Sequence, residues 1–271
     1  DGATVTGNVT ANGTLQFNQS GTTLTISNVI SGTGTLSLTN TGTLDLTGTT
    51  TVADTVVLDM TTTVSAGVLQ IQTGTGNLSV GSSGTGTLNV TGGRVTNSVG
   101  TLGENAGGVG TATVSSGTWA TSTTLSVGGG GTGTLDVNGG SVTSNLVGIG
   151  NLAGGVGTAT VSSGTWATST TLVVGRSGTG TLNVTGGYVG NASGILGVFA
   201  GSTGTATVSS GTWANSGNLV VGSSGTGTLT MSGGLVSVAG TLSKGGNGTI
   251  NLNSGGTLQI GTGTTGGVLG V

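Results

Sequence analysis

The 271-residue chain contains no cysteine and no histidine. Without cysteine it can form neither disulfides nor a thiolate nucleophile, although this absence does not fix the cellular compartment. Without histidine, Ser-His-Asp and Cys-His catalysis are excluded, together with zinc or iron sites built on imidazole. Only carboxylates remain for catalysis, and we expect no cofactor and no metal site.

Charged side chains are also scarce, with 3 Lys and Arg against 6 Asp and Glu. Arg94, Arg176 and Lys244 are the only bases, so the chain lacks the positive patch that a nucleic acid or an anionic membrane surface requires. The sequence has no run of roughly 18 or more apolar residues, the length that a membrane-spanning helix needs. We therefore expect no nucleic-acid partner and no membrane insertion of this segment.

What the chain does contain is glycine, 63 residues of it, and a repeat. Its three tryptophans lie 47 residues apart in nearly identical text, TATVSSGTWATS twice and TATVSSGTWANS once. Within each unit the phrase GTGTLNV and its variants alternate with GTATVSS, and the starts of successive phrases differ by 26 and 21 residues. Such half-repeats are too short for domains, but they suit single coils of a β-solenoid.

The phrase beginning at Gly84 shows the alternation of a β-strand. Side chains alternate between the two faces of a strand, so Thr85 and Thr87 are predicted to point outward and Leu88 and Val90 inward. Matching the phrases by their starts predicts one aliphatic core ladder, formed by Leu88, Val114, Leu135, Val161, Leu182, Val208 and Leu229.

The predicted fold is all-β, a right-handed parallel β-helix of roughly 11–12 coils. Glycine, threonine, serine and valine favour strands and tight turns, and parallel crossovers are right-handed in the great majority of cases. At the parallel strand spacing the rod is expected to be about 55 Å long. We expect one solenoid over residues 1–271, with irregular coils in 1–80, regular 47-residue double coils in 81–247 and terminal coils in 248–271.

Three carboxylates are close in sequence, at Asp45, Asp54 and Asp59. Paired carboxylates can cleave polysaccharides, but no basic residue or tyrosine accompanies these three, so solvated strand or turn acids are the preferred interpretation. A calcium-binding β-roll needs a regular G-G-x-G-x-D rhythm, which is missing here. The sequence therefore predicts no catalytic residues and a protein that is not an enzyme.

The sequences of two segments resemble the repeats of a known family. NVISGTGTLSLTNTGTLDLTG, at residues 28–48, resembles the autotransporter-associated β-strand repeat, and SSGTWANSGNLVVGSSGTGTLTMSGG, at residues 209–234, resembles a related glycine-rich repeat of type V secretion passengers. The resemblance implies a secreted or surface-displayed right-handed β-helix of a Gram-negative bacterium, used as an adhesin or as the stalk of one. The lack of cysteine is compatible with export of an unfolded chain.

Two surface features suggest partners. Exposed aromatic rings can stack on sugars, so the tryptophans could form a spaced row that binds host or biofilm glycans; alternatively, each covers a corner beside a glycine-rich turn. The Thr-x-Thr motif of each coil resembles the ice-binding face of some β-solenoid antifreeze proteins, although threonine is common on exposed strands. Tyr188, Phe17 and Phe199 are expected to pack rather than to bind. The candidate surface contacts are Trp119, Trp166, Trp213, Thr111, Thr113, Thr158 and Thr160.

The sequence thus favours a structural, extracellular β-solenoid that is adhesin-like or forms a surface fibre. A strand-forming sequence from Gly2 to Val271 predicts open strand edges that could pair with a second copy end to end. Flanking segments that cap both ends would prevent this pairing. A polysaccharide-binding or polysaccharide-cleaving β-helix is the alternative function, and ice binding a more remote one.

Overall fold

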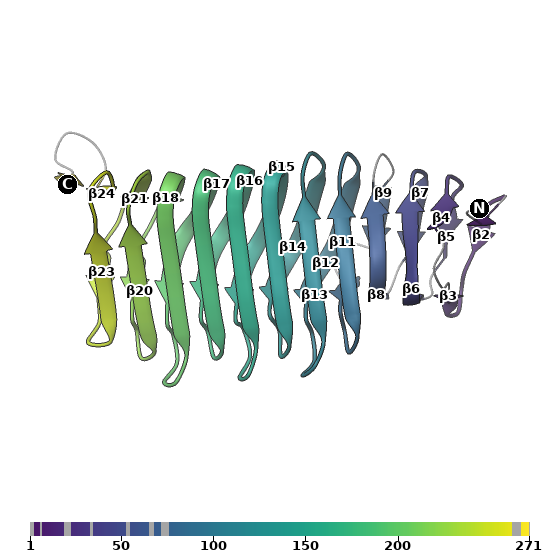
Figure 1. Cartoon of the computed structure of the whole chain (residues 1–271), viewed down its shortest axis with the longest axis horizontal. Coiled ribbons are helices and arrows are strands. Elements are labelled where there is room, and N and C mark those ends of the chain that lie inside the picture. The colour runs from purple at the N-terminus through teal and green to yellow at the C-terminus, as the bar shows by residue number, and fades with distance from the viewer. Residues whose placement is uncertain are drawn as a thin grey trace.

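The structure is a computed structural model and describes residues 3–5, 7–18, 23–32, 35–52, 55–64, 68–71, 76–261 and 267–270. These residues form strands and turns and contain no helix. The chain winds into a right-handed β-solenoid whose coils follow one another along a rod, with its two ends at opposite ends of the rod (Figure 1). The predicted fold class is confirmed.

In chain order the strands are β1 (Ala3–Thr4), β2 (Val9–Thr10), β3 (Leu15–Asn18), β4 (Thr23–Ile26), β5 (Ile30–Ser31), β6 (Leu36–Leu46), β7 (Thr49–Val52), β8 (Thr55–Val64), β9 (Val68–Ile71), β10 (Asn77–Val80), β11 (Thr85–Val90), β12 (Arg94–Leu102), β13 (Val109–Val114), β14 (Thr118–Val127), β15 (Thr132–Ile149), β16 (Val156–Val174), β17 (Thr179–Leu196), β18 (Thr203–Asn215), β19 (Leu219–Val221), β20 (Thr226–Met231), β21 (Leu235–Val238), β22 (Leu242–Lys244), β23 (Gly248–Leu252), β24 (Thr257–Ile260) and β25 (Gly267–Gly270).

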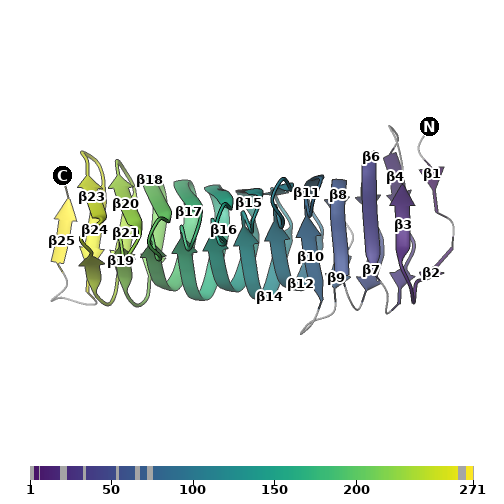
Figure 2. The same cartoon turned by 90° about the horizontal axis from the view of Figure 1, so that it is seen from below.

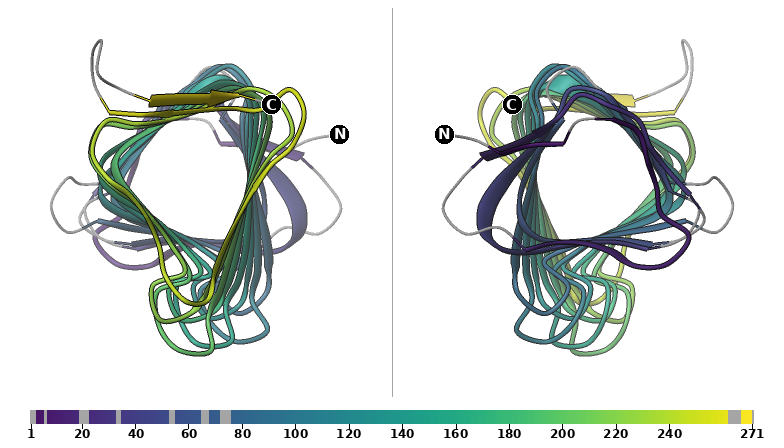
Figure 3. Two further views of the ribbon diagram at one scale, coloured as in Figure 1. Left: turned by 90° about the vertical axis from the view of Figure 1, so that its left-hand side faces the viewer. Right: turned by 90° about the vertical axis from the view of Figure 1, so that its right-hand side faces the viewer.

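Each coil contributes one strand segment to each of three sheets of parallel strands, which we call A, B and C in the order in which the chain crosses them. The three sheets give the rod a triangular outline in end view (Figure 3). Sheet A contains β11, β13, β20, β23 and the first parts of β15 to β18. Sheet B contains β21, β24 and the next parts of the long strands, including the starts of β12 and β14. Sheet C contains β10, β19, β22 and the ends of β12 and β14 to β17. Strands β1 to β9 continue the same three stacks toward the N-terminal end.

Sheet C holds eleven strand segments among the described residues, one per coil, from β3 to β22. Ten turns therefore separate its first segment from its last. This agrees with the predicted number of coils and, at about 4.8 Å per coil, gives a rod about 50 Å long. Figure 2 shows the same coils from below, still in chain order along the rod.

The register between coils differs from the predicted one. Gly86 pairs with Gly110, which pairs with Gly133, so successive coils are 24 and 23 residues long rather than 26 and 21. These glycines face inward, and a Cβ on Gly110 would overlap the carbonyl oxygen of Val80 in the preceding coil. The register therefore follows the position where only glycine fits, which in GTGTLNV is the second glycine of the phrase and in GTATVSS the first.

The predicted core ladder consists of two ladders. All seven of its residues are completely buried, but Leu88 stacks on Ala112 and Val90 on Val114. One ladder alternates leucine and alanine along the rod, and in the other the valines from Val90 to Val208 are followed by Met231 and Leu252. Alternation of large and small residues lets neighbouring layers interdigitate, which a ladder of leucine and valine alone would not do.

The alternation of faces is as predicted. In β11, β13 and β20 the residues alternate between outward positions and fully buried ones, beginning with an exposed residue. The buried side chains form one continuous cluster that runs from Leu24 to Leu258. Each coil therefore buries its apolar edge against its neighbours, as a solenoid must.

One strand departs from the parallel arrangement. β25 pairs antiparallel with β24, so it covers the outer edge of sheet B at the last coil. In Figure 3 it lies along one side of the triangular end of the rod, next to the C label. In the described residues no further strand pairs with the outer edges of β22 and β23.

Candidate binding surface

The three tryptophans lie in the core and cannot be surface contacts. Their side chains are completely buried, because their positions on sheet B face the interior. The Nε1–H of Trp119 donates to Oδ1 of Asn97, and that of Trp213 to Oδ1 of Asn191, both at 2.7 Å. Each partner belongs to the preceding coil. The expectation of an exposed tryptophan row is therefore wrong, and the alternative of packing at a glycine-rich corner fits the burial.

The predicted threonine contacts lie on the outward face of sheet A, where they are half-buried. Thr111 and Thr158 belong to an unbroken column of threonines, with Thr134 between them. The column of Thr113 and Thr160 is mixed, because Asp136 lies between those two. Partial burial raises the pKa of the Asp136 carboxyl above its ordinary value.

The carboxylates are not gathered into one site. Asp45 pairs with threonines of sheet A, whereas Asp59 is at the end of a sheet C segment, and its Oδ1 accepts the backbone N–H of Ser82 at 2.7 Å. Asp54 lies outside the described residues. Within the described part of the chain, no group of three or more acidic residues is arranged to hold a metal ion.

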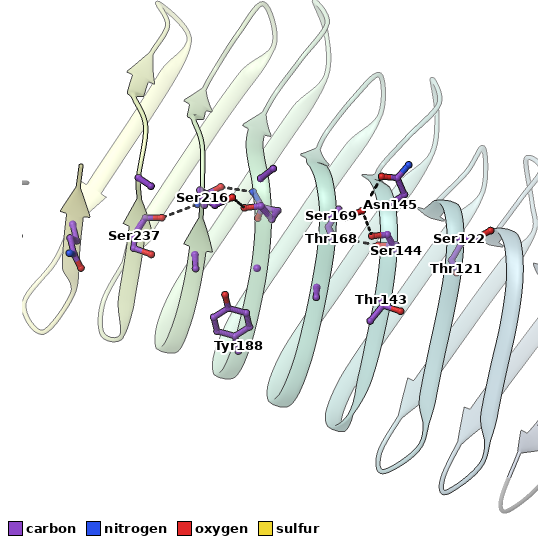
Figure 4. A pocket seen from close by; sticks show the side chains of 18 of the residues that line it. Thr121, Ser122, Thr143, Ser144, Asn145, Thr168, Ser169, Tyr188, Ser216 and Ser237 are labelled. Carbon is purple, nitrogen blue, oxygen red and sulfur yellow. Dashed lines mark hydrogen bonds between the residues drawn. The ribbon is translucent and has the colours of Figure 1, made fainter. Parts of the chain in front are cut away.

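The surface does contain a groove, which lies over sheet B and its corner with sheet C and encloses about 910 Å³ (Figure 4). It crosses seven successive coils, from the coil of Thr121 to that of Gln259. At about 4.8 Å per coil its length is about 29 Å. No Asp, Glu, Lys or Arg is among the described residues that line it.

Small side chains form the floor of the groove. Along one outward column of sheet B, Thr143 stacks on Ala167, then Gly190, Ala214 and Ser237. Larger side chains in this column would fill the space. The groove therefore results from one column of short residues repeated over successive coils.

Hydroxyl and amide groups form the wall at the corner between sheets B and C. Ser169 Oγ donates to Asn145 Oδ1 at 2.9 Å, and the oxygens of Ser144 and Thr168 are 3.3 Å apart. Figure 4 shows these four side chains together on neighbouring coils. Their mutual hydrogen bonds hold a row of polar atoms along the groove.

Tyr188 is the aromatic residue of this groove. Its side chain is 42% exposed, so the ring packs only in part. A Cβ on Gly190 would lie 2.7 Å from Cε1 and 2.8 Å from the hydroxyl oxygen of Tyr188, so the ring lies across Gly190. Phe199, also predicted to pack, is 50% exposed but lies outside the groove; Phe17 packs partly buried against the core.

The groove was not predicted, although one signal for Tyr188 was present. Val189 faces the core, so the alternation of sheet B places the preceding residue outside.

The described part of the chain contains no helix long and apolar enough to cross a membrane. Comparison of the chain with protein-family models, curated proteins and solved structures gave no match.

Proposed function

We propose that the chain is a non-enzymatic, architectural β-solenoid that acts as an adhesin-like rod on the outside of a Gram-negative cell. The observation that carries the proposal is the continuous core from Leu24 to Leu258. Because every coil rests on the next in fixed register, the rod can present a repeated outer surface at constant spacing. Many weak contacts to such a surface add up to strong attachment without one deep site.

The proposed location rests on the resemblance to autotransporter passengers. Residues 28–48 contain β5 and β6, and residues 209–234 contain β19, β20 and the end of β18. Each resembling segment therefore corresponds to about one coil of the rod, as a structural repeat should. An exported chain without cysteine also avoids disulfides that would form before passage through a pore.

End-to-end association of two copies is part of the same proposal. The outer edges of β22 and β23 carry backbone groups that another chain could pair with, whereas β25 covers the edge of sheet B. Electron microscopy over a range of protein concentrations tests this. Fibres with an axial repeat of about 53 Å, from eleven coils at about 4.8 Å each, support end-to-end association, and rods of one length at every concentration contradict it.

Binding is preferred to cleavage as the alternative function. Asp45 and Asp59 lie in different sheets, and Asp59 is engaged by a backbone N–H. Release of reducing ends from a polysaccharide panel by the purified chain would contradict the non-enzymatic proposal. The mixed column of Thr113, Asp136 and Thr160 likewise gives no observation that favours ice binding.

The adhesive role can be tested by displaying the chain on a bacterial host and measuring the cells retained on coated surfaces under flow. Leu135→Asp places a charge in the completely buried ladder and should disrupt the coils around it. The control is Thr134→Ser, on the outward face next to it. We expect retention with the natural chain and the control, and loss with Leu135→Asp. Equal retention of all three cell types, or none above bare cells, would overturn the proposal.

A further inference from the structure

The groove over sheet B has the dimensions of a site for a chain-like ligand. Its floor follows one column of stacked residues over six coils, and the groove as a whole crosses seven, which makes it about 29 Å long. It is open along this length and follows the axis of the rod. An extended oligomer can lie in such a groove, whereas a single small molecule would leave most of it empty.

The chemistry of the lining restricts the ligand further. The lining residues are threonine, serine, asparagine, glutamine, alanine, glycine and Tyr188, with no charged side chain among those described. Hydroxyl and amide groups can both donate and accept hydrogen bonds, which matches a ligand rich in hydroxyl groups. A polyanion would find no cation to offset the loss of its hydration in this groove. The lining thus fits a neutral glycan better than a uronic-acid polymer or a nucleic acid.

Tyr188 provides the apolar surface that such a ligand needs. An exposed aromatic ring offers apolar area together with one polar group, and the apolar C–H face of a sugar ring can stack on it. Gly190 has no side chain, and this leaves room for the Tyr188 ring to lie across it. The coils on either side place Thr165 and Thr212 at the positions that pair with Tyr188, so the ring is a single platform in an otherwise polar and small-residue surface.

We propose that this groove binds an extended, neutral polysaccharide, with Tyr188 stacked on one sugar ring and with the hydroxyl and amide groups of the wall, such as Asn145, Ser169 and Ser216, bonded to sugar hydroxyls. The inference gives the adhesin-like proposal a ligand class. It can fail separately, because a rod can attach through another surface.

The experiment is isothermal titration calorimetry of the purified chain with cellohexaose, maltohexaose, laminarihexaose and chitohexaose, and with hexagalacturonate as the anionic probe. We expect binding of at least one neutral oligomer and at least tenfold weaker binding of hexagalacturonate. Tyr188→Ala should weaken the neutral oligomer at least tenfold, and Tyr188→Phe should retain most of the affinity because the ring remains. Ala214→Arg should abolish binding by filling the floor.

The matched control is Phe199→Ala, which removes an exposed aromatic ring outside the groove and should leave the affinity unchanged. Circular dichroism should show the natural fold for all variants, since each changed side chain is on the surface. Three results would overturn the inference: no neutral oligomer binds, Tyr188→Ala and Ala214→Arg both bind as well as the natural chain, or Tyr188→Phe loses as much as Tyr188→Ala. Retention of displayed cells despite Tyr188→Ala would leave the adhesive role standing and move it to another surface.

Discussion

Of the three tryptophans, Trp166 alone has a buried Nε1–H without a hydrogen-bond partner. The position that supplies asparagine to the other two tryptophans is occupied by Ser144, whose side chain is shorter. A second residue differs in the same coil. Where the other two coils have Gly100 and Gly194, this coil has Val147.

The two differences are coupled by space. A Cβ on Gly100 would lie 3.0 Å from Cζ2 of Trp119 and 3.2 Å from Nδ2 of Asn97, so asparagine and tryptophan use the room that glycine leaves. Val147 is completely buried and takes that room in its own coil. We therefore expect Ser144→Asn and Val147→Gly to be unfavourable singly and compatible together.

The magnitudes follow from burial. Val147→Gly removes a buried side chain and adds backbone freedom, which should lower the free energy of unfolding by about 3 kcal/mol. Ser144→Asn alone overpacks the site and should cost about 1 to 3 kcal/mol. The double variant fills the space and satisfies the Trp166 N–H, so its stability should equal or exceed that of the natural chain, by up to about 1 kcal/mol.

Equilibrium urea unfolding of the four proteins measures the coupling. With the double variant at least as stable as the natural chain, the expected coupling energy is at least about 4 kcal/mol, which is larger than the roughly 0.5 to 3 kcal/mol usual for residues in contact. The reverse pair, Asn97→Ser with Gly100→Val, copies the Trp166 arrangement onto Trp119 and should be tolerated better than either single change. Additive effects within about 0.5 kcal/mol in both cycles would refute the reasoning.

Other positions give further predictions. Thr62 has a buried hydroxyl without a partner, so Thr62→Val should raise the free energy of unfolding by about 1 kcal/mol, while Thr63→Val on the outward face should change it little; a loss of stability in the first would contradict this. Gly150 has φ +65 and faces the carbonyl of Thr179, so Gly150→Ala should lower the free energy of unfolding by about 2 kcal/mol or more and the thermal midpoint with it. Gly246→Ala, where a Cβ meets open space, should leave the thermal midpoint unchanged. Burial raises the pKa of Asp136 above its ordinary 3.8, so the folded state binds more protons there than the unfolded state, and stability falls as the pH rises from about 3.8. Asp136→Asn should remove this loss of stability and so stabilise the protein at neutral pH. If the urea midpoint of the natural chain is the same at acidic and neutral pH, as it should be for the variant, Asp136 does not contribute in this way.

The sequence predicted the solenoid because the fold depends on local patterns. Alternation placed Leu88 inside and Thr87 outside without reference to the rest of the chain, and the 47-residue repeat showed that the coils stack. The predicted register is wrong because it aligns the first residues of the repeated phrases. Stacking is instead decided by which glycine lies against the backbone of the neighbouring coil. Gly86, rather than the first glycine of its phrase, has that contact.

The candidate surface was harder to predict. Trp119 was open to both interpretations, because burial depends on whether Asn97 in another coil can accept its N–H. Tyr188 could have been placed outward from the buried Val189. The groove itself depends on how the short residues of four other coils align with Gly190, and an incorrect register hides that alignment.

The register is also the central claim that one measurement tests most directly. The natural chain has no cysteine, so pairs of cysteines can be introduced without competing thiols. Thr111 pairs with Thr134, so the variant Thr111→Cys/Thr134→Cys has Cα atoms about 4.8 Å apart, within the range that a disulfide bridges. Thr111→Cys/Thr132→Cys is offset by two residues, about 8 Å, beyond that range. Mass spectrometry after mild oxidation should find the intramolecular disulfide in the first variant only; a disulfide in the second variant and not in the first would contradict the 24- and 23-residue coils and the groove built on them.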